Sequence, residues 1–506
     1  MTEPDSAEAV AADETELSGA AAAGTERFNL RGRTLRAHAA RGGLINTAFL
    51  VSLSGLSLLR GLVLAAFLTQ EEFGIWGVTV IGFAAIIAFR QAGIGDKFIQ
   101  QDEADQEEAF QRAWTLETLL AGLSFIALVV AAPLLALLYG DDRILLPALA
   151  LTVLMPASVL QVPLWVFYRR MEFLKQRTLQ AIEPIVTFVV SIGLAIAGAG
   201  YWALFGGVIA GAYASGIAAY RASPYPFRWR YDGRTLRSYW SFSWPLMLAT
   251  GSGVVIAFTS MFAASQALGL AGAGAITLAA NITAFTDRVD QIVTGTLYPA
   301  IAAVKDRVDL LHESFVKSNR LALIWAVPFG LGLSLFGADL VHYVLGDKWE
   351  DMIILLQVYG LVAALHHVGF NWHAYFRALG DTRPMAVATG AAAIVFLCTA
   401  VPLLFVSGLE GFAIGVAAQS VVHVACRAFY LRRLFDGFEF LRHAARAFIP
   451  TLPAAAAVLA LRALETGERS GGRAVAELAS YLVLVAAATW WLERGLLREA
   501  AGYARG

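Results

Sequence analysis

Long apolar runs alternate with short polar segments along nearly the whole chain. From residue 43 onward they predict fourteen helices, each near the ~20 apolar residues that cross a bilayer core of ~30 Å. The expected bounds are 43–68, 75–98, 113–139, 144–168, 179–197, 201–220, 239–263, 273–301, 321–345, 352–378, 384–406, 412–431, 444–462 and 474–492. We therefore expect an all-α integral membrane protein with fourteen transmembrane helices.

Composition supports this expectation. Hydrophobic residues make up 58% of the 506 residues and charged residues only 15%, whereas a soluble domain carries about 25% charge. The two cysteines, Cys398 and Cys426, both lie in apolar runs, so neither a disulfide framework nor a metal site is indicated. Residues 1–42 begin as an acidic, Ala-rich segment without an apolar core, and we expect a largely disordered tail.

Landmarks in the first half of the chain return in the second. Residues 138–141 and 344–347 both end in Gly-Asp, and 167–169 and 375–377 both consist of two aromatic residues followed by Arg. Each copy contains six predicted helices. Because six is even, the two copies share an orientation and would be related by a pseudo-two-fold axis along the membrane normal.

The repeat and its flanks predict the domain organisation. We expect a tail (1–42), a first lobe (43–221), a linker (222–238), a second lobe (239–433), helices 13 and 14 (444–493) and a tail (494–506).

Basic residues supply the orientation. Of the 38 Lys and Arg, most fall at the termini and in the even-numbered loops, and only Arg143, Lys348, Arg469 and Arg473 fall in the odd-numbered loops. By the positive-inside rule, both termini are cytoplasmic.

Charged residues inside predicted membrane helices are costly, so each is a candidate for a site. The first lobe offers Arg60 and Arg90, and the eighth helix offers Asp287, Arg288 and Asp290. Arg60 lies well inside the first helix and favours a polar cavity, whereas Arg90 is equally compatible with snorkelling at a helix end. Asp287 or Arg288 could also satisfy the first-lobe charges structurally.

Histidines form a second group of candidates. The tenth helix carries His366, His367 and His373 with Asn371, and the twelfth carries His423. Such residues could form a proton relay, and His366 and His373 share a helical face. Arg427 lies one turn from the basic end of its helix, and we expect it to be an interfacial anchor.

The second helix carries a family resemblance. It opens with Glu71, Glu72, Phe73 and Gly74, continues as an apolar helix, and ends at Arg90 followed by the glycine-rich segment 91–95. This succession, together with the chain from residue 43 onward, resembles Wzx-type oligosaccharide flippases of the multidrug/oligosaccharidyl-lipid/polysaccharide exporter superfamily.

The resemblance implies a two-lobed fold with a central cavity and alternating access. The substrate it implies is an oligosaccharide on undecaprenyl diphosphate, moved from the cytoplasmic to the outer leaflet of the bacterial inner membrane for a surface or extracellular polysaccharide. Arg60, Arg90 and Arg288 fit the family's basic residues that hold the anionic head group. Implied partners are membrane lipids, a polysaccharide polymerase and a chain-length regulator, with no nucleic acid.

Other functions stay open. A lipid II flippase also has fourteen helices, and a multidrug cation antiporter shares the superfamily but commonly has twelve helices and a first-lobe acidic residue. An enzyme is disfavoured because no loop is large, and because Glu117 and Glu183 stand alone near predicted helix starts, where anchoring is expected. We expect no cofactor, no catalytic residue and no metal. Coupling to protons or sodium through Asp287, Asp290, His366 and His373 is a hypothesis.

Overall fold

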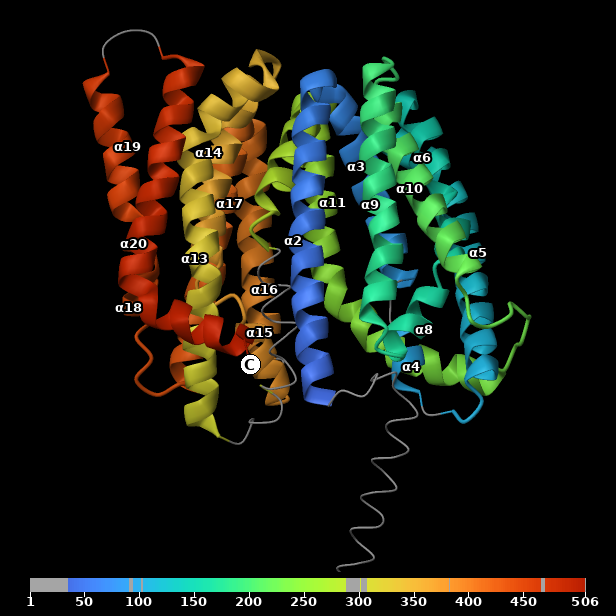
Figure 1. The fold of residues 1–506 in the computed structure, drawn as a ribbon. Helices are drawn as coiled ribbons and strands as arrows, with labels where there is room; N and C mark the ends of the chain where they lie inside the picture. Colours follow the sequence, from blue (N-terminus) through green and yellow to red (C-terminus); the bar gives the residue numbers. More distant parts are fainter. Residues whose placement is uncertain are drawn as a thin grey trace, which may run out of the picture.

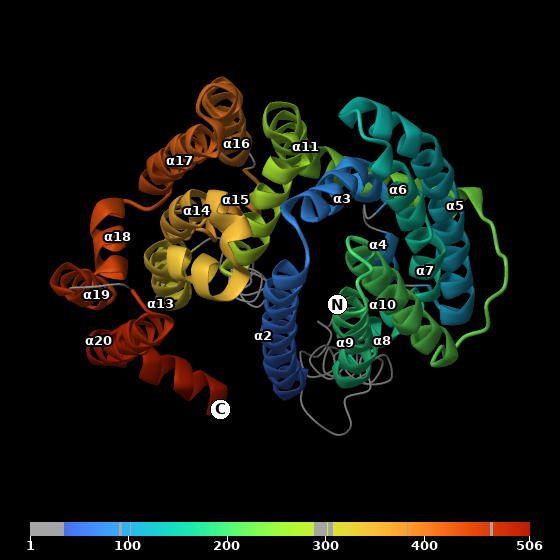
Figure 2. The ribbon, with the colours of Figure 1, turned by 90° about the horizontal axis from the view of Figure 1, so that it is seen from above.

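The computed structural model describes residues 35–90, 94–101, 103–287, 301, 307–381, 383–465 and 469–505. Helices dominate these residues, and they form two bundles that stand side by side (Figures 1 and 2). Helices α2 and α11 lie where the two bundles adjoin, one in each bundle (Figure 2). In Figure 1 the lower end of the molecule carries the start of α2 and the C-terminus, and the upper end carries the turn between α2 and α3.

The first bundle consists of α2 (Leu35–Phe67), α3 (Gln70–Arg90), α4 (Ile94–Gln100), α5 (Gln106–Tyr139), η1 (Asp142–Ile144), α6 (Leu145–Thr152), α7 (Leu154–Leu160), α8 (Pro163–Arg169), α9 (Phe173–Ile196) and α10 (Trp202–Arg221). The second consists of α11 (Gly233–Thr283), α13 (Val308–Leu340), η2 (Val341–Leu345), η3 (Asp347–Met352), α14 (Ile353–His366), α15 (Trp372–Ala378), α16 (Arg383–Val395), η4 (Phe396–Ala400) and α17 (Val401–Leu434). Then follow α18 (Phe440–Phe448), α19 (Leu452–Leu464) and α20 (Gly471–Arg505).

The helices are apolar enough to identify a multi-pass membrane protein. The described residues hold 10 helices that could cross a membrane, or 11 if the bent pair α18 and α19 is counted as one span. The predicted number of fourteen is therefore not confirmed. One of the 10 is the continuous stretch Arg383–Leu434 of 52 residues, which contains a kink at Ser407 and Gly408.

One predicted membrane helix in each bundle is broken into shorter pieces. The predicted helix 144–168 consists of η1, α6, α7 and α8, and Pro156 and Pro163 each remove a backbone donor there. The predicted helix 352–378 divides into α14 and α15 around Gly369, which has a φ of +74° that favours glycine. Both breaks leave backbone groups inside the bundle that need partners other than their own helix.

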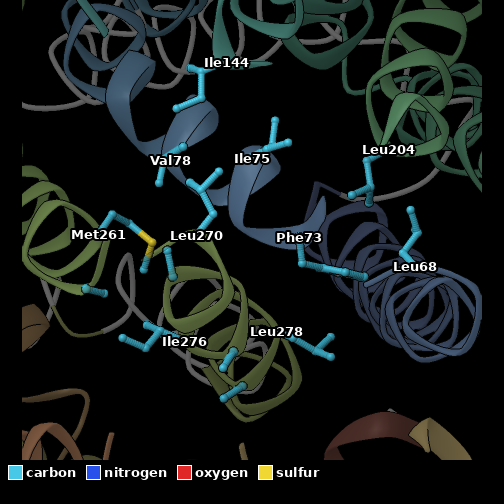
Figure 3. Packing of buried hydrophobic residues seen from close by; sticks show 14 of the residues in the cluster. Leu68, Phe73, Ile75, Val78, Ile144, Leu204, Met261, Leu270, Ile276 and Leu278 are labelled. Atoms are coloured by element: carbon cyan, nitrogen blue, oxygen red, sulfur yellow. The ribbon is translucent and has the colours of Figure 1, made fainter. Parts of the chain in front are cut away.

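The two bundles pack against each other through a reciprocal glycine contact. A Cβ on Gly74 of α3 would lie 2.0 Å from the carbonyl oxygen of Leu270, and one on Gly274 of α11 would lie 1.8 Å from that of Gln70. Positions 70 and 74 thus face positions 270 and 274 at a constant offset. The surrounding contact is apolar and includes the buried Phe73 of α3 (Figure 3).

Ion pairs attach α20 to the second bundle at both of its ends. At the upper end, Arg469 places Nε 2.5 Å from Asp339 of α13 and Nη2 2.8 Å from Glu477 of α20, and hydrogen bonds to these carboxylates raise the pKa of Arg469. At the lower end, Arg320 of α13 pairs with the buried Glu493. The last two helices are therefore fixed to α13 rather than to the first bundle.

Candidate functional site

Arg60 lies in the upper part of α2, seven residues before the helix ends. At 1.5 Å per residue, this places it roughly 10 Å below the end of the helix. Its side chain is half-buried, and its Nη1 is buried without a hydrogen-bond partner among the described residues. A buried donor on a permanently charged guanidinium is costly unless an acceptor reaches it. The guanidinium group of Arg60 is therefore able to donate a hydrogen bond to an anionic group of a ligand.

The other two arginines predicted to bind the head group are placed less fully. Arg90 is the last residue of α3, and the structure describes its backbone but not its side chain. Arg288 lies outside the described residues, as does Asp290. Their assignment to a site stays a prediction.

Asp287 lies four residues after the end of α11 and is exposed. Its Oδ1 is 3.7 Å from Nε2 of His367, which is buried at the break between α14 and α15. The ring of His367 also places Nδ1 2.8 Å from the carbonyl oxygen of Ala363. The carboxylate of Asp287 thus lies near a histidine of the second bundle.

His366 and His373, predicted to take part in ion coupling, both come close to a third imidazole. The ring centroid of His423 on α17 is 5.1 Å from that of His366 and 6.5 Å from that of His373. Trp372 lies near two of these rings, with its centroid 4.8 Å from that of His373 and 6.5 Å from that of His423. The Nε1 of Trp372 and Nε2 of His423 are buried without hydrogen-bond partners in the described structure. This histidine cluster (His366, His373, His423 and Trp372) is a polar site inside the second bundle.

Arg427 is not the interfacial anchor that the sequence suggested. Its side chain is 1% exposed, and its Nη1 donates to the carbonyl oxygens of His366 and Val368, the latter at 2.9 Å. The basic end of its helix misled the prediction, because the break at Gly369 provides carbonyl groups that the sequence does not reveal. Arg427 therefore supplies hydrogen-bond donors to two carbonyl groups at the break between α14 and α15.

Residues of α13 complete the support of the same break. Nδ2 of Asn319 donates to the carbonyl oxygen of His367, and its Oδ1 accepts from the backbone N–H of Gly369, both at 3.0 Å. Asn371 donates to the hydroxyl of Ser318 at 2.7 Å. Asn319 is fully buried, yet the sequence analysis did not single it out. Asn319 lies in the polar first part of α13, two residues before the membrane helix predicted at 321–345, so the apolar pattern gave no signal for it.

The break in the first bundle carries a carboxylate. Nε2 of Gln161, between α7 and α8, donates to Oε2 of Glu183 at 2.9 Å. The sequence placed Glu183 near a helix start, but α9 begins at Phe173, so Glu183 lies ten residues inside it. The prediction of a helix-end anchor is therefore wrong, because the polar residues 175–178 continue the helix rather than precede it.

At the upper end of the molecule, hydrogen bonds join the two bundles. Nε1 of Trp349 on η3 donates to the carbonyl oxygen of Ala65, and Nζ of Lys348 donates to that of Ala66, both at 2.9 Å. Beside this contact lies a hollow of about 710 Å³ whose polar lining includes Gln70, Glu350 and Glu410. Among the residues that the structure describes, no group of three or more His, Cys, Asp or Glu is arranged to hold a metal ion.

The described residues thus form two helical bundles packed against each other, each containing a broken helix. The fold is similar to a solved structure of the lipid II flippase MurJ in an inward closed conformation, with a TM-score of 0.69, 10% identity, and coverage of 90% of this chain and 99% of that one. An inward-facing multidrug resistance MATE family transporter of the MOP superfamily gives a TM-score of 0.61 at 14% identity, with coverage of 78% of this chain and 98% of the other. At these identities the likeness concerns the fold alone.

Residues 63–354 match the family described as polysaccharide biosynthesis protein, and the chain belongs to this family. The resemblance to polysaccharide exporters is thereby confirmed. The succinoglycan biosynthesis transport protein ExoT of Rhizobium meliloti (strain 1021) is 24% identical over 299 residues, 58% of this chain and 60% of ExoT. The lipopolysaccharide biosynthesis protein WzxC of Escherichia coli (strain K12) is 26% identical over 328 residues, 63% of this chain and 65% of WzxC. The matches thus span less than two thirds of either relative.

Proposed function

We propose that this chain is a flippase that moves an oligosaccharide linked to undecaprenyl diphosphate from the cytoplasmic to the outer leaflet of the bacterial inner membrane. The family of polysaccharide biosynthesis proteins supports the substrate class, as do one relative named for succinoglycan biosynthesis transport and one named for lipopolysaccharide biosynthesis. The distribution of basic residues supports cytoplasmic termini, so the lower end faces the cytoplasm and the upper end faces outward. The product would enter a surface or extracellular polysaccharide, with a polymerase and a chain-length regulator acting next.

The observation that carries the proposal is the unpartnered guanidinium nitrogen of Arg60. A diphosphate supplies several acceptor oxygens and negative charge, and Arg offers it a planar pair of donors. Binding would therefore satisfy the buried donor while the lipid tail stays in the bilayer. Arg90 and Arg288 are proposed to contribute to the same head-group site.

Reconstituted vesicles test this function. Purified protein should move a lipid-linked oligosaccharide between leaflets, and Arg60→Ala should lower the rate about tenfold to a hundredfold, from losing one charge-assisted hydrogen bond of ~1.5–3 kcal/mol. Arg60→Lys keeps the charge but not the fork and should fall between the two. Arg442→Ala is the control, because its side chain is 78% exposed and pairs only loosely with Glu439. Full transport by Arg60→Ala would contradict the head-group assignment.

Lipid II is the alternative substrate, because it carries the same diphosphate and the fold resembles MurJ. A multidrug cation is the second alternative. Offering each compound to the same vesicles separates the three: movement of lipid II but not of a longer lipid-linked oligosaccharide would favour the first alternative. Movement of a lipophilic cation alone would favour the second.

Coupling to protons or sodium is proposed to use Asp287, Asp290, His366 and His373. Two observations support the proposal for Asp287 and the histidines: Asp287 approaches His367, and the histidine cluster contains unpartnered polar atoms among the described residues. A pH gradient across the vesicle should then accelerate movement, and His373→Gln should weaken that acceleration. Equal rates with and without the pH gradient would exclude coupling to protons. A sodium gradient tests coupling to sodium in the same way.

A further inference from the structure

Residues from the other bundle contact the last turn of α2 at its upper end. A helix leaves its last four carbonyl groups without partners inside the helix. Two of these groups, on Ala65 and Ala66, accept hydrogen bonds from Trp349 and Lys348 of η3, both at 2.9 Å. Because η3 belongs to the second bundle, one bundle caps a helix of the other.

The contact is reciprocal, and it combines the buried side chain of Trp349 with the exposed side chain of Lys348. The carbonyl oxygen of Lys348 accepts from Nε2 of Gln70, in the first turn of α3, at 2.6 Å. The ring of Trp349 meets that of Phe73 edge to face, with centroids 5.3 Å apart, and Trp349 is 0% exposed. We call this set (Ala65, Ala66, Gln70, Lys348 and Trp349) the clasp.

The charge of Lys348 suits this position. The carboxyl end of a helix carries partial negative charge, which an ammonium group stabilises. Lys348 is also one of only four basic residues that the sequence places on the outward side. Electrostatic complementarity between bundles therefore accounts for a lysine that the orientation rule disfavours.

We propose that the clasp is the outer gate of the transport pathway, which closes when η3 caps α2 and opens when water replaces those hydrogen bonds. This inference rests on the proposed function only in assuming that the two bundles separate at the upper end during transport. Separation exposes the Ala65 and Ala66 carbonyl groups to solvent, which can hydrogen-bond them in turn. Each exchanged hydrogen bond therefore contributes modestly, by roughly twofold to tenfold in the ratio of closed to open molecules. Such small contributions suit a gate that must open in every cycle.

The test measures the distance between the bundles at the upper end. Spin labels at Leu138→Cys and Val344→Cys report it, because both side chains are exposed and lie in α5 and η2 respectively. Cys398 and Cys426 are first replaced by Ser. Double electron–electron resonance on purified protein in nanodiscs then gives the populations of short and long distances.

Two variants remove single hydrogen bonds and leave most of the packing in place. Trp349→Phe removes the indole N–H, and Lys348→Met removes the ammonium group. Each should raise the ratio of long to short distances by roughly twofold to tenfold. Arg143→Met is the matched control, since Arg143 is a basic residue at the same end whose carboxylate partners, Glu71 and Asp141, belong to its own bundle. It should leave the distances unchanged.

Unchanged distance distributions in both clasp variants, with monodisperse protein of normal thermal stability, would overturn the proposal. A shift equal to that of Arg143→Met would overturn it as well, because it would reflect general loosening of the upper loops. If the distances shift as expected but no lipid-linked oligosaccharide moves in vesicles, the gate stands and the proposed substrate fails. If transport is normal but the distances do not shift, the proposed function stands and the gate proposal fails.

Discussion

The glycine crossing between α3 and α11 provides the sharpest test of how the bundles fit together. Gly274→Ala adds a Cβ 1.8 Å from the carbonyl oxygen of Gln70. A carbon and a carbonyl oxygen normally approach no closer than about 3.3 Å. The obstructing atom belongs to the backbone and cannot rotate away, so the two helices must separate by roughly 1.5 Å. Overpacking of this kind costs about 1–3 kcal/mol.

A matched glycine isolates this cost. Gly390 in α16 has no atom within 4 Å of an added Cβ, so Gly390→Ala should stabilise by about 0.5–1 kcal/mol through helix propensity alone. Because Gly274→Ala receives the same propensity gain, the difference between the two variants should equal the overpacking cost of about 1–3 kcal/mol. Gly74→Ala should behave like Gly274→Ala, because its Cβ meets the carbonyl of Leu270 at 2.0 Å.

Thermal unfolding in nanodiscs measures all three variants. The two crossing variants should unfold at lower temperature than the parent, and Gly390→Ala at the same or a higher temperature. If Gly274→Ala were as stable as Gly390→Ala, the close approach of α3 and α11 would be wrong. If only one crossing variant were destabilised, the reciprocity of the contact would be refuted.

Three further predictions concern the second bundle and the upper loops. Arg469→Ala should lower unfolding stability by about 1–3 kcal/mol in a denaturant titration, since it leaves buried carboxylates short of a partner, whereas the exposed Arg442→Ala should change it by less than about 0.5 kcal/mol. Asn319→Leu should cost more than about 2 kcal/mol by the same measurement, because it strands two buried backbone groups at the helix break, and a smaller loss would contradict their assignment. Hydrogen bonding from Arg143 lowers the pKa of Asp141, so its stabilising contribution should be complete above the unfolded value of about 3.9 and should disappear as the pH falls through the lower folded pKa. Asp141→Asn should remove that acid-dependent part of the unfolding curve, and an unchanged curve would count against the ion pair.

The sequence allowed an all-helical, multi-pass membrane protein to be predicted because the signal of an apolar span is local, whereas the number of fourteen spans is not confirmed. About twenty apolar residues mark a span regardless of what packs against it. The internal repeat was also visible, since duplication leaves matching landmarks such as residues 138–141 and 344–347. Neither observation required knowledge of how the helices are arranged in space.

The polar contacts could not be predicted in the same way, because each depends on where a helix breaks. Arg427 was misassigned because its partners are the carbonyl groups released around Gly369. Glu183 was misassigned because α9 begins earlier than the apolar pattern indicates. Trp349 attracted no attention, since its partner carbonyl belongs to Ala65, 284 residues away, and an alanine carbonyl has no signature in a sequence.

The glycine crossing has the form of an interface between two copies of one protein. In a symmetric dimer, residue i of one subunit meets residue j of its partner, and residue j of the first meets residue i of the second. Positions 74 and 270 meet in this chain, as do 274 and 70, at a spacing of 200 residues. A substitution in either copy therefore alters only half of the contact. Because the two bundles belong to one chain, their sequences can change independently. The glycine contact can therefore be retained in both bundles while the residues around it differ between them.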